Sequence, residues 1–239
     1  MEVLSHNTAI VTAAGSGTRM GGSVKKQFRK LGGIPVLIRT LSVFMESPII
    51  GEILITAPSD ELDATRSLIQ GYFPSSAKPW RVIAGGAQRQ DSVYLALKGC
   101  PEDTRYVFIH DGVRPFISQE LIAELFEAVQ ECGAVIPGAA LKHTVKEVQN
   151  GMVQSTLERS RLMQVFTPQV FDYAMILEAH QKAGEEGFYG TDDASLLEHY
   201  GKAVRVLPSS ELNLKLTDTN DWLLADLLIK ENIESIDED

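Results

Sequence analysis

The chain has 239 residues, of which 44% are hydrophobic and 23% are charged, so it is an ordinary globular sequence long enough to bury a core as one domain, residues 1–239. Its formal charge of −10 makes nucleic acid and anionic membranes poor partners. A signal peptide pattern and a bilayer-spanning apolar run are both lacking. Cys100 and Cys132 have no metal-ligand spacing and are expected to be reduced thiols at helix ends, which favours a cytoplasmic location.

Strands and helices alternate through the first 140 residues. Apolar runs predict strands at 8–12, 53–55, 81–84, 106–109 and 134–136. Helices are predicted at 34–45 and 88–97, after Ser59 as an N-cap, and from Ser118 as an N-cap to about Glu131. This alternation predicts a Rossmann-like, mostly parallel α/β sheet with helices on both faces. Right-handed crossovers would then bring the strand-to-helix loops to one edge.

The pattern changes after Ala140, where two extended runs, 144–149 and 152–157, flank Asn150-Gly151. Asn-Gly between two such runs is the strongest short-range signal for a β-hairpin. The runs are polar and two strands alone are marginally stable, so the hairpin arm, residues 142–158, must pack on something else. Its own domain and a second subunit both remain open at this point.

The last third of the chain returns to the alternating pattern. Core-like sequence resumes at 165–168, and strands are predicted at 204–206 and 212–216. Helices are predicted at 171–182, 192–200 and 221–233.

The loop after the first strand reads AAGSGTRMGG. A Rossmann dinucleotide loop requires Gly where Met20 stands, and a Walker A loop requires Lys where Ser23 stands, so both fingerprints fail. Two readings remain. The loop is either an ordinary Gly-rich turn with solvated basic residues, or a nest of backbone N–H groups that binds an anion beside Arg19 and Lys26.

Four further polar segments follow predicted strands or precede predicted helices: GGAQRQDS, HDGVRP, FTPQ and GTDDAS. In the predicted sheet these loops converge on the same edge as the Gly-rich loop. Asp111, in the second of them, would face a metal–phosphate assembly there, although an Asp at such a position is also commonly a cap.

The motifs AAGSGTRMG, KKQF, GGAQRQDSV, HDGVRP, HTVK, LERS, FTPQ, TDDAS and LNLKLT occur in an order that closely resembles the 2-C-methyl-D-erythritol 4-phosphate cytidylyltransferase family, from Ala9 to about Ala225. The resemblance implies a nucleotidyltransferase fold. It also implies transfer of a cytidylyl group from CTP to 2-C-methyl-D-erythritol 4-phosphate with release of pyrophosphate, in isoprenoid precursor synthesis. Mg²⁺ or another divalent cation is the implied cofactor, and a homodimer with active sites shared through the arm is the implied assembly.

The same resemblance implies roles for individual residues. The cations that stabilise charge on the reacting phosphates are Arg19, Lys26, Arg159 and Lys215. The positions that bind the nucleotide are Ala13, Ala14, Gly15, Gly17, Gly86, Ser92 and Asp111. The positions around the second substrate are Asp111, Gly112, Arg114, Thr144, Arg159, Thr167 and Thr191.

The implied reaction explains this residue choice. A phosphate monoester oxygen attacks the α-phosphorus of CTP in line, and because both reactants are anions, cations must first cancel their repulsion. The nucleophile needs no strong base, so His110, His143 and His180 are interpreted as structural or positioning residues. Asp111 is the one candidate metal ligand, and the metal is otherwise expected to be held by phosphates.

Two rival functions remain. Ribitol-5-phosphate cytidylyltransferase would share the fold and the chemistry, but Ala13-Ala14-Gly15 and Arg89-Gln90-Asp91-Ser92 favour the erythritol phosphate. His143, where the family usually has Asp, and Ala87, where it often has an acidic residue, depart from the family pattern. A non-catalytic nucleotide-binding homologue is the other rival, and the four cations kept in an acidic chain argue against it.

Overall fold

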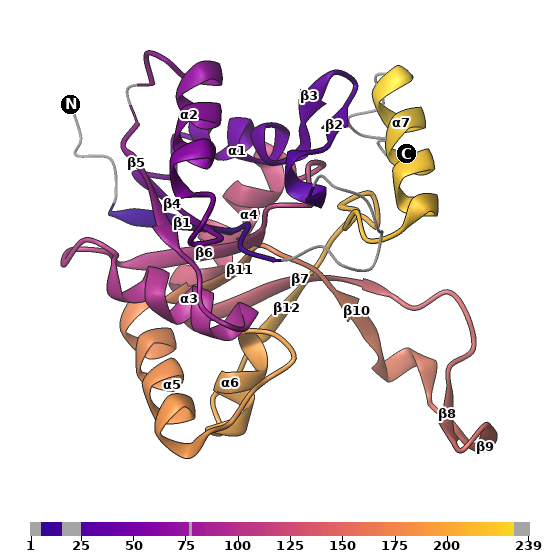
Figure 1. The fold of residues 1–239 in the computed structure, drawn as a ribbon. Coiled ribbons are helices and arrows are strands. Elements are labelled where there is room, and N and C mark those ends of the chain that lie inside the picture. The colour runs from indigo at the N-terminus through magenta and orange to yellow at the C-terminus, as the bar shows by residue number, and fades with distance from the viewer. Residues whose placement is uncertain (1–5, 16–24, 77, 232–239) are drawn as a thin grey trace.

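A mixed eight-stranded sheet forms the centre of the chain in the computed structural model, which describes residues 6–15, 25–76 and 78–231 (Figure 1). The strand order is β10-β7-β11-β6-β1-β4-β5, and β12 also pairs with β7. The strands are β1 Asn7–Thr12, β4 Glu52–Ala57, β5 Trp80–Ala84, β6 Tyr106–Asp111, β7 Ala134–Ala140, β10 Met163–Val165, β11 Gln169–Asp172 and β12 Arg205–Pro208.

The four adjacent strands β6, β1, β4 and β5 pair in parallel, which confirms the predicted mostly parallel α/β sheet. β10 and β11 are antiparallel to their neighbours. In the register of β11, Gln169 pairs with Ile109 near the end of β6. The FTPQ segment therefore enters the sheet at the same edge that the parallel strands leave.

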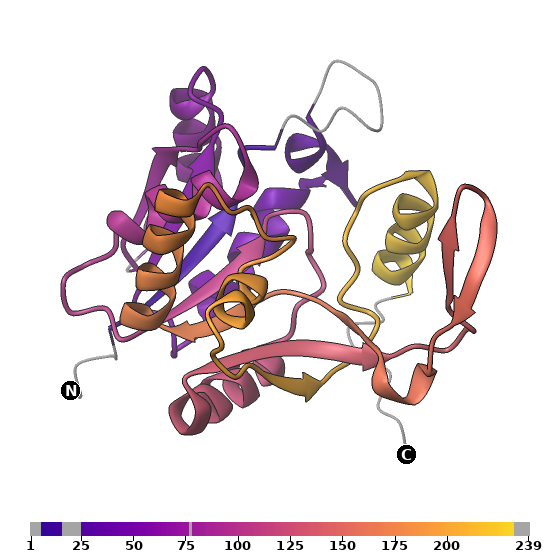
Figure 2. The same ribbon diagram turned by 90° about the horizontal axis from the view of Figure 1, so that it is seen from below.

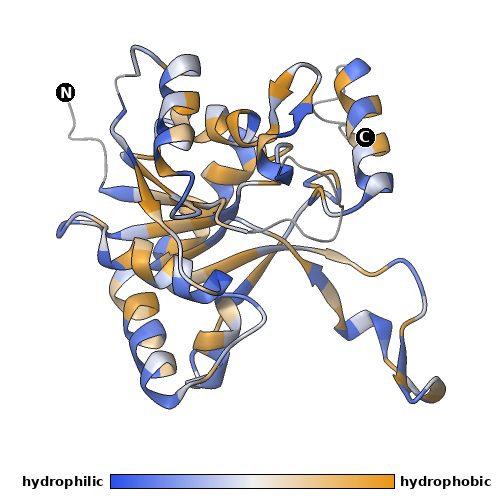
Figure 3. Cartoon of the chain, viewed as in Figure 1, coloured by the Kyte–Doolittle hydropathy of each residue, from blue (hydrophilic) through white to orange (hydrophobic). Residues whose placement is uncertain are grey.

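Helices cover both faces of the sheet (Figures 1 and 2). One face carries α1 Val36–Glu46, α2 Leu62–Tyr72 and α4 Gln119–Cys132, and the other carries α3 Arg89–Lys98, α5 Tyr173–Glu186 and α6 Ala194–His199. Alternate residues of β1 supply the two cores, since Ala9 and Val11 join one cluster and Ile10 joins the other. Figure 3 shows the resulting concentration of hydrophobic residues along the central strands.

The last helix, α7 Thr219–Lys230, lies apart from these two layers (Figure 1). It docks through a small third core on the short strand β2 Lys30–Leu31, which pairs with β3 Ile34–Pro35. This core includes Leu216 and Val113, so the segment that leads into α7 is anchored beside the HDGVRP loop.

Ser118 is the N-cap of α4, as predicted, and its hydroxyl accepts a hydrogen bond from Leu121 N at 3.1 Å. Several other predicted boundaries are wrong. The helix predicted at 171–182 begins at Tyr173, because residues 171–172 belong to the strand β11. The helix predicted at 34–45 begins at Val36, because Ile34–Pro35 pairs with β2. Ser59 caps no helix, because a turn closed by Glu61 N and Pro58 O intervenes, and α2 begins at Leu62.

The strand predicted at 212–216 is also wrong, since this segment forms no strand. Its backbone groups instead form hydrogen bonds with the HDGVRP loop, about a hundred residues earlier in the chain. Leu216 N donates to Val113 O at 2.9 Å, and Arg114 Nη1 donates to Asn213 O at 2.8 Å. The segment is thereby fastened to the HDGVRP loop rather than to a neighbouring strand.

The predicted hairpin is confirmed. The strands β8 Lys146–Gln149 and β9 Met152–Thr156 pair only with each other and project from the sheet (Figures 1 and 2). Asn150 and Gly151 both have positive φ, 51° and 78°, as a type I′ turn requires. Val153 is 59% exposed and Met152 is 69% exposed, so the arm leaves apolar side chains uncovered within one chain.

Cys100 and Cys132 are both free thiols at helix ends, and the cytoplasmic location stays a prediction. Within residues 6–15, 25–76 and 78–231, the structure contains no helix with the length and apolar character needed to cross a membrane.

Phe44→Ala should lower the free energy of unfolding by about 3–5 kcal/mol, because Phe44 is fully buried between α1 and the sheet. Urea unfolding followed by circular dichroism measures this loss. Leu223→Ala on α7, where the side chain is 60% exposed, is the matched control and should change stability little. Equal losses in the two variants would contradict the assignment of the core.

Candidate active site

The described start of the Gly-rich loop, Ala13–Gly15, is held by a side chain from the KKQF segment. Gln27 lies in the 3₁₀ turn Lys26–Phe28 and is 3% exposed. Its Nε2 donates to Ala13 O at 2.7 Å and lies 3.3 Å from Gly15 O. Gln27 thereby fixes the direction of this backbone as it leaves β1. Gly17 and Arg19, further along the loop, lie outside the described residues.

Two glycines let the loop after β5 pack closely, Gly85 against the loop after β1 and Gly86 against the start of α3. A Cβ on Gly85 would lie 2.3 Å from Ala14 Cβ, and a Cβ on Gly86 would lie 2.3 Å from Asp91 Cβ. Ser92 orders the same loop, because its hydroxyl accepts from Gly86 N at 3.0 Å and donates to Gln88 O at 3.1 Å. Ser92 is buried, and both hydrogen bonds of its hydroxyl go to the backbone of this loop.

Asp111, the last residue of β6, is the centre of charge at this edge. Its Oδ1 lies 3.1 Å from Arg89 Nε, and its Oδ2 lies 2.8 Å from Lys215 Nζ and 3.4 Å from Arg114 Nε. Its side chain is only 7% exposed. Three cations from three separate segments therefore meet on one buried carboxylate, which we call the Asp111 cluster: Asp111, Arg89, Arg114 and Lys215.

The cluster keeps Asp111 ionised. Burial alone would raise the pKa of its carboxyl group, but Arg89, Lys215 and Arg114 together bring that pKa well below its ordinary value. Arg89 responds in the opposite sense. Burial lowers the pKa of its guanidinium, whereas Asp193 and Asp111 raise it, and the net shift is upward. Asp111 and Arg89 therefore both stay charged over the whole physiological pH range.

Thr167 supports Asp111 from the FTPQ segment. Its Oγ1 accepts from Asp111 N at 3.1 Å and lies 3.0 Å from His110 Nδ1, while His110 Nε2 lies 3.0 Å from Arg114 O. With the imidazole neutral and its Nε2 protonated, every hydrogen bond in this chain has one donor and one acceptor. Burial lowers the pKa of His110 to about 4, which agrees with the neutral form. Gly112 follows, and its N–H donates to Thr12 O at 2.9 Å.

Lys26 reaches the same edge from the other side. Its Nζ donates to Thr217 O at 2.5 Å, in the segment that carries Lys215. Neighbouring Lys25 instead forms an ion pair with Glu61 at 3.0 Å. Lys26, although far away in the sequence, is thus bonded to the segment that carries Lys215 of the Asp111 cluster.

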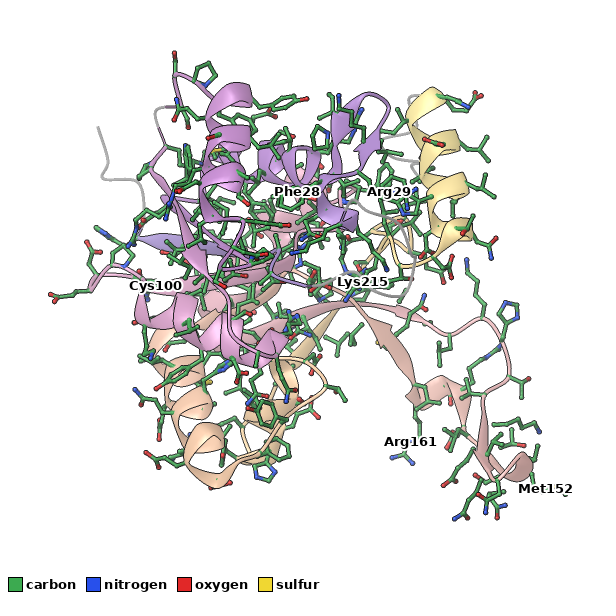
Figure 4. The ribbon with its side chains drawn as sticks, viewed as in Figure 1. Phe28, Arg29, Cys100, Met152, Arg161 and Lys215 are labelled. Carbon is green, nitrogen blue, oxygen red and sulfur yellow. The ribbon has the colours of Figure 1, made fainter. Side chains whose placement is uncertain are left out.

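Three predicted site residues are exposed, and none of them bonds to this cluster within the described residues: Thr144 and Arg159 in or beside the arm, and Thr191 before α6. Arg159 Nη1 donates to Lys142 O at 2.6 Å at the base of the arm. In Figure 4, Arg161, in the short turn Arg159–Arg161 that follows the arm, points away from Lys215. Within one chain the arm therefore does not complete the site.

The residues that the sequence reasoning did not assign to the site are Gln27, Arg89, Asp193 and Asn213. Each lies within three residues of an assigned residue in the same motif, but the motif alone does not show which side chains it contacts. Asn213 Nδ2 donates to Thr167 O at 2.7 Å and so joins two of these motifs.

Within the part of the chain that the structure describes, no group of three or more His, Cys, Asp or Glu side chains could hold a metal ion. Asp111 is the carboxylate of the Asp111 cluster, and both of its oxygens already face cations. The donor set therefore fits a cation such as Mg²⁺ that keeps most of its waters and takes its other ligands from phosphates.

A mostly parallel α/β sheet with a Gly-rich loop and several cations at its carboxyl edge defines the class of nucleotidyltransferases. The family model described as IspD, 2-C-methyl-D-erythritol 4-phosphate cytidylyltransferase, matches residues 7–231. The chain belongs to this family.

Individual relatives agree. A 2-C-methyl-D-erythritol 4-phosphate cytidylyltransferase of Bacillus cytotoxicus is 43% identical over 92% of this chain and 96% of its own length. That of Geobacter metallireducens is 39% identical over 94% of this chain and 98% of its own. The crystal structure of 4-diphosphocytidyl-2C-methyl-D-erythritol synthase from Anaerococcus prevotii superposes with a TM-score of 0.83 at 30% identity, covering 95% of this chain and 99% of that one.

Lowering the pH should destabilise the protein through His110. Its pKa is about 4 in the folded chain against 6.5 for the unperturbed group, so the unfolded state takes up a proton first. The stability of the neutral form is complete above pH 6.5 and is lost as the pH falls toward 4. The thermal midpoint should therefore fall less between pH 7.5 and 5.5 in His110→Gln than in wild type. Exposed His143→Gln is the control, and an unchanged pH dependence in His110→Gln would contradict this role.

Proposed function

We propose that the chain transfers the cytidylyl group of CTP to 2-C-methyl-D-erythritol 4-phosphate, giving 4-diphosphocytidyl-2-C-methyl-D-erythritol and pyrophosphate. The observation that carries the proposal is the gathering of Lys26, Arg89, Arg114 and Lys215 at one edge of the sheet in a chain of net charge −10. Two polyanions can meet there only because local positive charge opposes the field of the rest of the protein.

The nucleotide would lie on the backbone of Ala13, Ala14, Gly15 and Gly86. The close approach of these two loops, with Ala14 against Gly85, supports a narrow base pocket lined by fixed backbone donors and acceptors. Such a pocket suits a pyrimidine, because a site that pairs with the polar edge of one base rejects others by a wide margin. We assign the triphosphate to the remainder of the same loop, where Gly17 and Arg19 belong.

The transfer requires charge neutralisation more than proton transfer. The phosphate of the acceptor would attack the α-phosphorus in line, with Lys26 and Lys215 on either side of the reacting groups. Arg114, Gly112 and Thr191 would orient the hydroxyls of the acceptor, and Thr167 would act through its bonds to Asp111 and His110. The buried, neutral imidazole is consistent with a reaction that uses no histidine base.

Asp111 would hold Mg²⁺ through one carboxylate oxygen. The phosphates of the substrates would supply further ligands, and water would supply the rest. When bound, the ion supplies neutralisation of phosphate charge and polarisation of the phosphoryl group. The residues of the chain hold the phosphates in position around it, with Lys26 and Lys215 as fixed cations.

A homodimer would complete the site through the arm. The exposed apolar side chains of Met152 and Val153, together with the absence of contact between Arg159 and the Asp111 cluster within one described chain, support this arrangement. In it, Thr144 and Arg159 would grip the acceptor phosphate in the neighbouring subunit.

Pyrophosphate release from CTP should be rapid with 2-C-methyl-D-erythritol 4-phosphate and at least tenfold slower with D-ribitol 5-phosphate. Replacing CTP by ATP should reduce the rate of pyrophosphate release further, because the base pocket is built from fixed backbone groups. Such sites can discriminate by roughly 10⁴-fold. Preference for ribitol phosphate would select the sister activity. Nucleotide binding without turnover on either acceptor would select a non-catalytic homologue.

Lys26→Ala should lower kcat by about 10²–10³ with little loss of stability, because removing one preorganised charge contact commonly has this effect. Lys25→Ala is the matched control, since the adjacent ammonium is paired with Glu61 instead. Steady-state kinetics with thermal unfolding of both variants decides the matter. Equal activity in the two variants would show that the Lys26 ammonium plays no part in the transfer.

Mixing Lys26→Ala with Arg159→Ala should restore activity to about a quarter of wild type after random subunit exchange. Half of the dimers are then mixed, and each mixed dimer has one intact site if the arm serves the neighbour. Exchange is verified with differently tagged subunits. A monomeric protein, or no recovery despite exchange, would place the action of the arm within its own subunit.

A further inference from the structure

Arg89 bridges two buried carboxylates that come from distant parts of the chain. Its Nε lies 3.1 Å from Asp111 Oδ1, and its Nη1 donates to Asp193 Oδ2 at 2.7 Å. Asp193 has a side chain that is 1% exposed, and its other oxygen lies 3.4 Å from His180 Nε2. A single guanidinium therefore links the catalytic edge of the sheet to a carboxylate behind it, because its fork can serve two acceptors at once.

Asp193 is itself held rigidly. Gln169, the first residue of β11, accepts through Oε1 from Asp193 N at 3.1 Å and from Ala194 N at 3.0 Å. The Nε2 of the same side chain donates to Asp192 Oδ2 at 2.6 Å. The start of α6 is thus fastened to the sheet, and Asp193 offers Arg89 a fixed anchor rather than a mobile surface partner.

The consequence concerns Lys215, whose side chain is 41% exposed and whose Nζ lies 2.8 Å from Asp111 Oδ2. A movement of this ammonium toward a substrate phosphate would loosen its pairing with Asp111. That step would leave a carboxylate that is only 7% exposed, and a buried charge is costly unless other partners remain. Arg114 contacts it only at 3.4 Å, whereas Arg89 contacts the opposite oxygen at 3.1 Å.

We propose that Arg89, anchored by Asp193, is a positioning residue for the transfer. It holds and neutralises Asp111 so that Lys215 can turn from the carboxylate to the phosphate anions. Without Arg89, Asp111 would keep Lys215 as its principal counter-ion. Lys215 would then stay paired with the carboxylate and would not contact the substrate phosphates. This role rests on the proposed cytidylyl transfer. Arg89 and Asp193 would support that reaction without touching a substrate.

Arg89→Gln should lower kcat/KM by roughly tenfold to a hundredfold, the range expected when one charged hydrogen bond is lost. The same variant should have a lower thermal midpoint, because Asp193 is left as a buried carboxylate without its guanidinium. Arg89→Lys should recover only part of the activity, since one ammonium cannot serve both carboxylates with the geometry of the guanidinium.

The double variant Arg89→Gln/Asp193→Asn separates positioning from folding. It removes the unpaired buried carboxylate, so the thermal midpoint should return toward wild type while kcat/KM stays low. Recovery of activity together with stability would overturn the proposal, because Arg89 would then be a structural residue only.

A double-mutant cycle with Asp111→Asn tests the route through Asp111. In that background Lys215 has no carboxylate to hold it, so adding Arg89→Gln should lower kcat/KM by less than threefold. A full additional loss of tenfold or more would mean that Arg89 acts independently of Asp111 and would overturn the inference. If wild type releases no pyrophosphate with either acceptor, the proposed function fails. If wild type is active and Arg89→Gln matches it, only the positioning role fails.

Discussion

A single buried carboxylate organises the catalytic edge of this protein. Asp111 ends the central strand β6 and gathers Arg89, Arg114 and Lys215 around its two oxygens. Repulsion would drive these cations apart in its absence, and it would be costly to bury without them. The cluster carries more positive than negative charge, so it both stabilises the loops that meet there and attracts polyphosphates to an acidic protein.

The loops around this carboxylate are joined mainly by side chains that bond to backbone. Gln27 holds the carbonyl groups at the start of the Gly-rich loop, Ser92 orders the loop after β5, and Asn213 joins the segment before α7 to Thr167 O. Such bonds remove the conformational freedom that polar loops would otherwise have. Preorganisation of this kind is what electrostatic catalysis requires, since charges that must reorient during the reaction stabilise it less.

The arm follows a different physical rule. Asn150 and Gly151 make a tight turn without strain, but the two short strands have no sheet on which to rest and leave Val153 exposed. A two-stranded hairpin is marginal in water, which favours the packing on a neighbouring subunit that we propose above. Arg159 at its base is therefore best understood as part of a site that two subunits build together, as we propose above.

Local pattern was enough to determine the alternating strands and helices, the cap at Ser118 and the hairpin at Asn150-Gly151, because each depends on neighbours within a few residues. It also identified the loops of the site, since parallel strands bring their carboxyl ends to one edge. The contacts between those loops were decided only by tertiary structure. Arg89 meets Asp193 across more than a hundred residues, and 212–216 forms no strand because its backbone is bonded to the HDGVRP loop. Neither pairing leaves a periodic signal in the sequence, because each depends on where the completed sheet places the two segments.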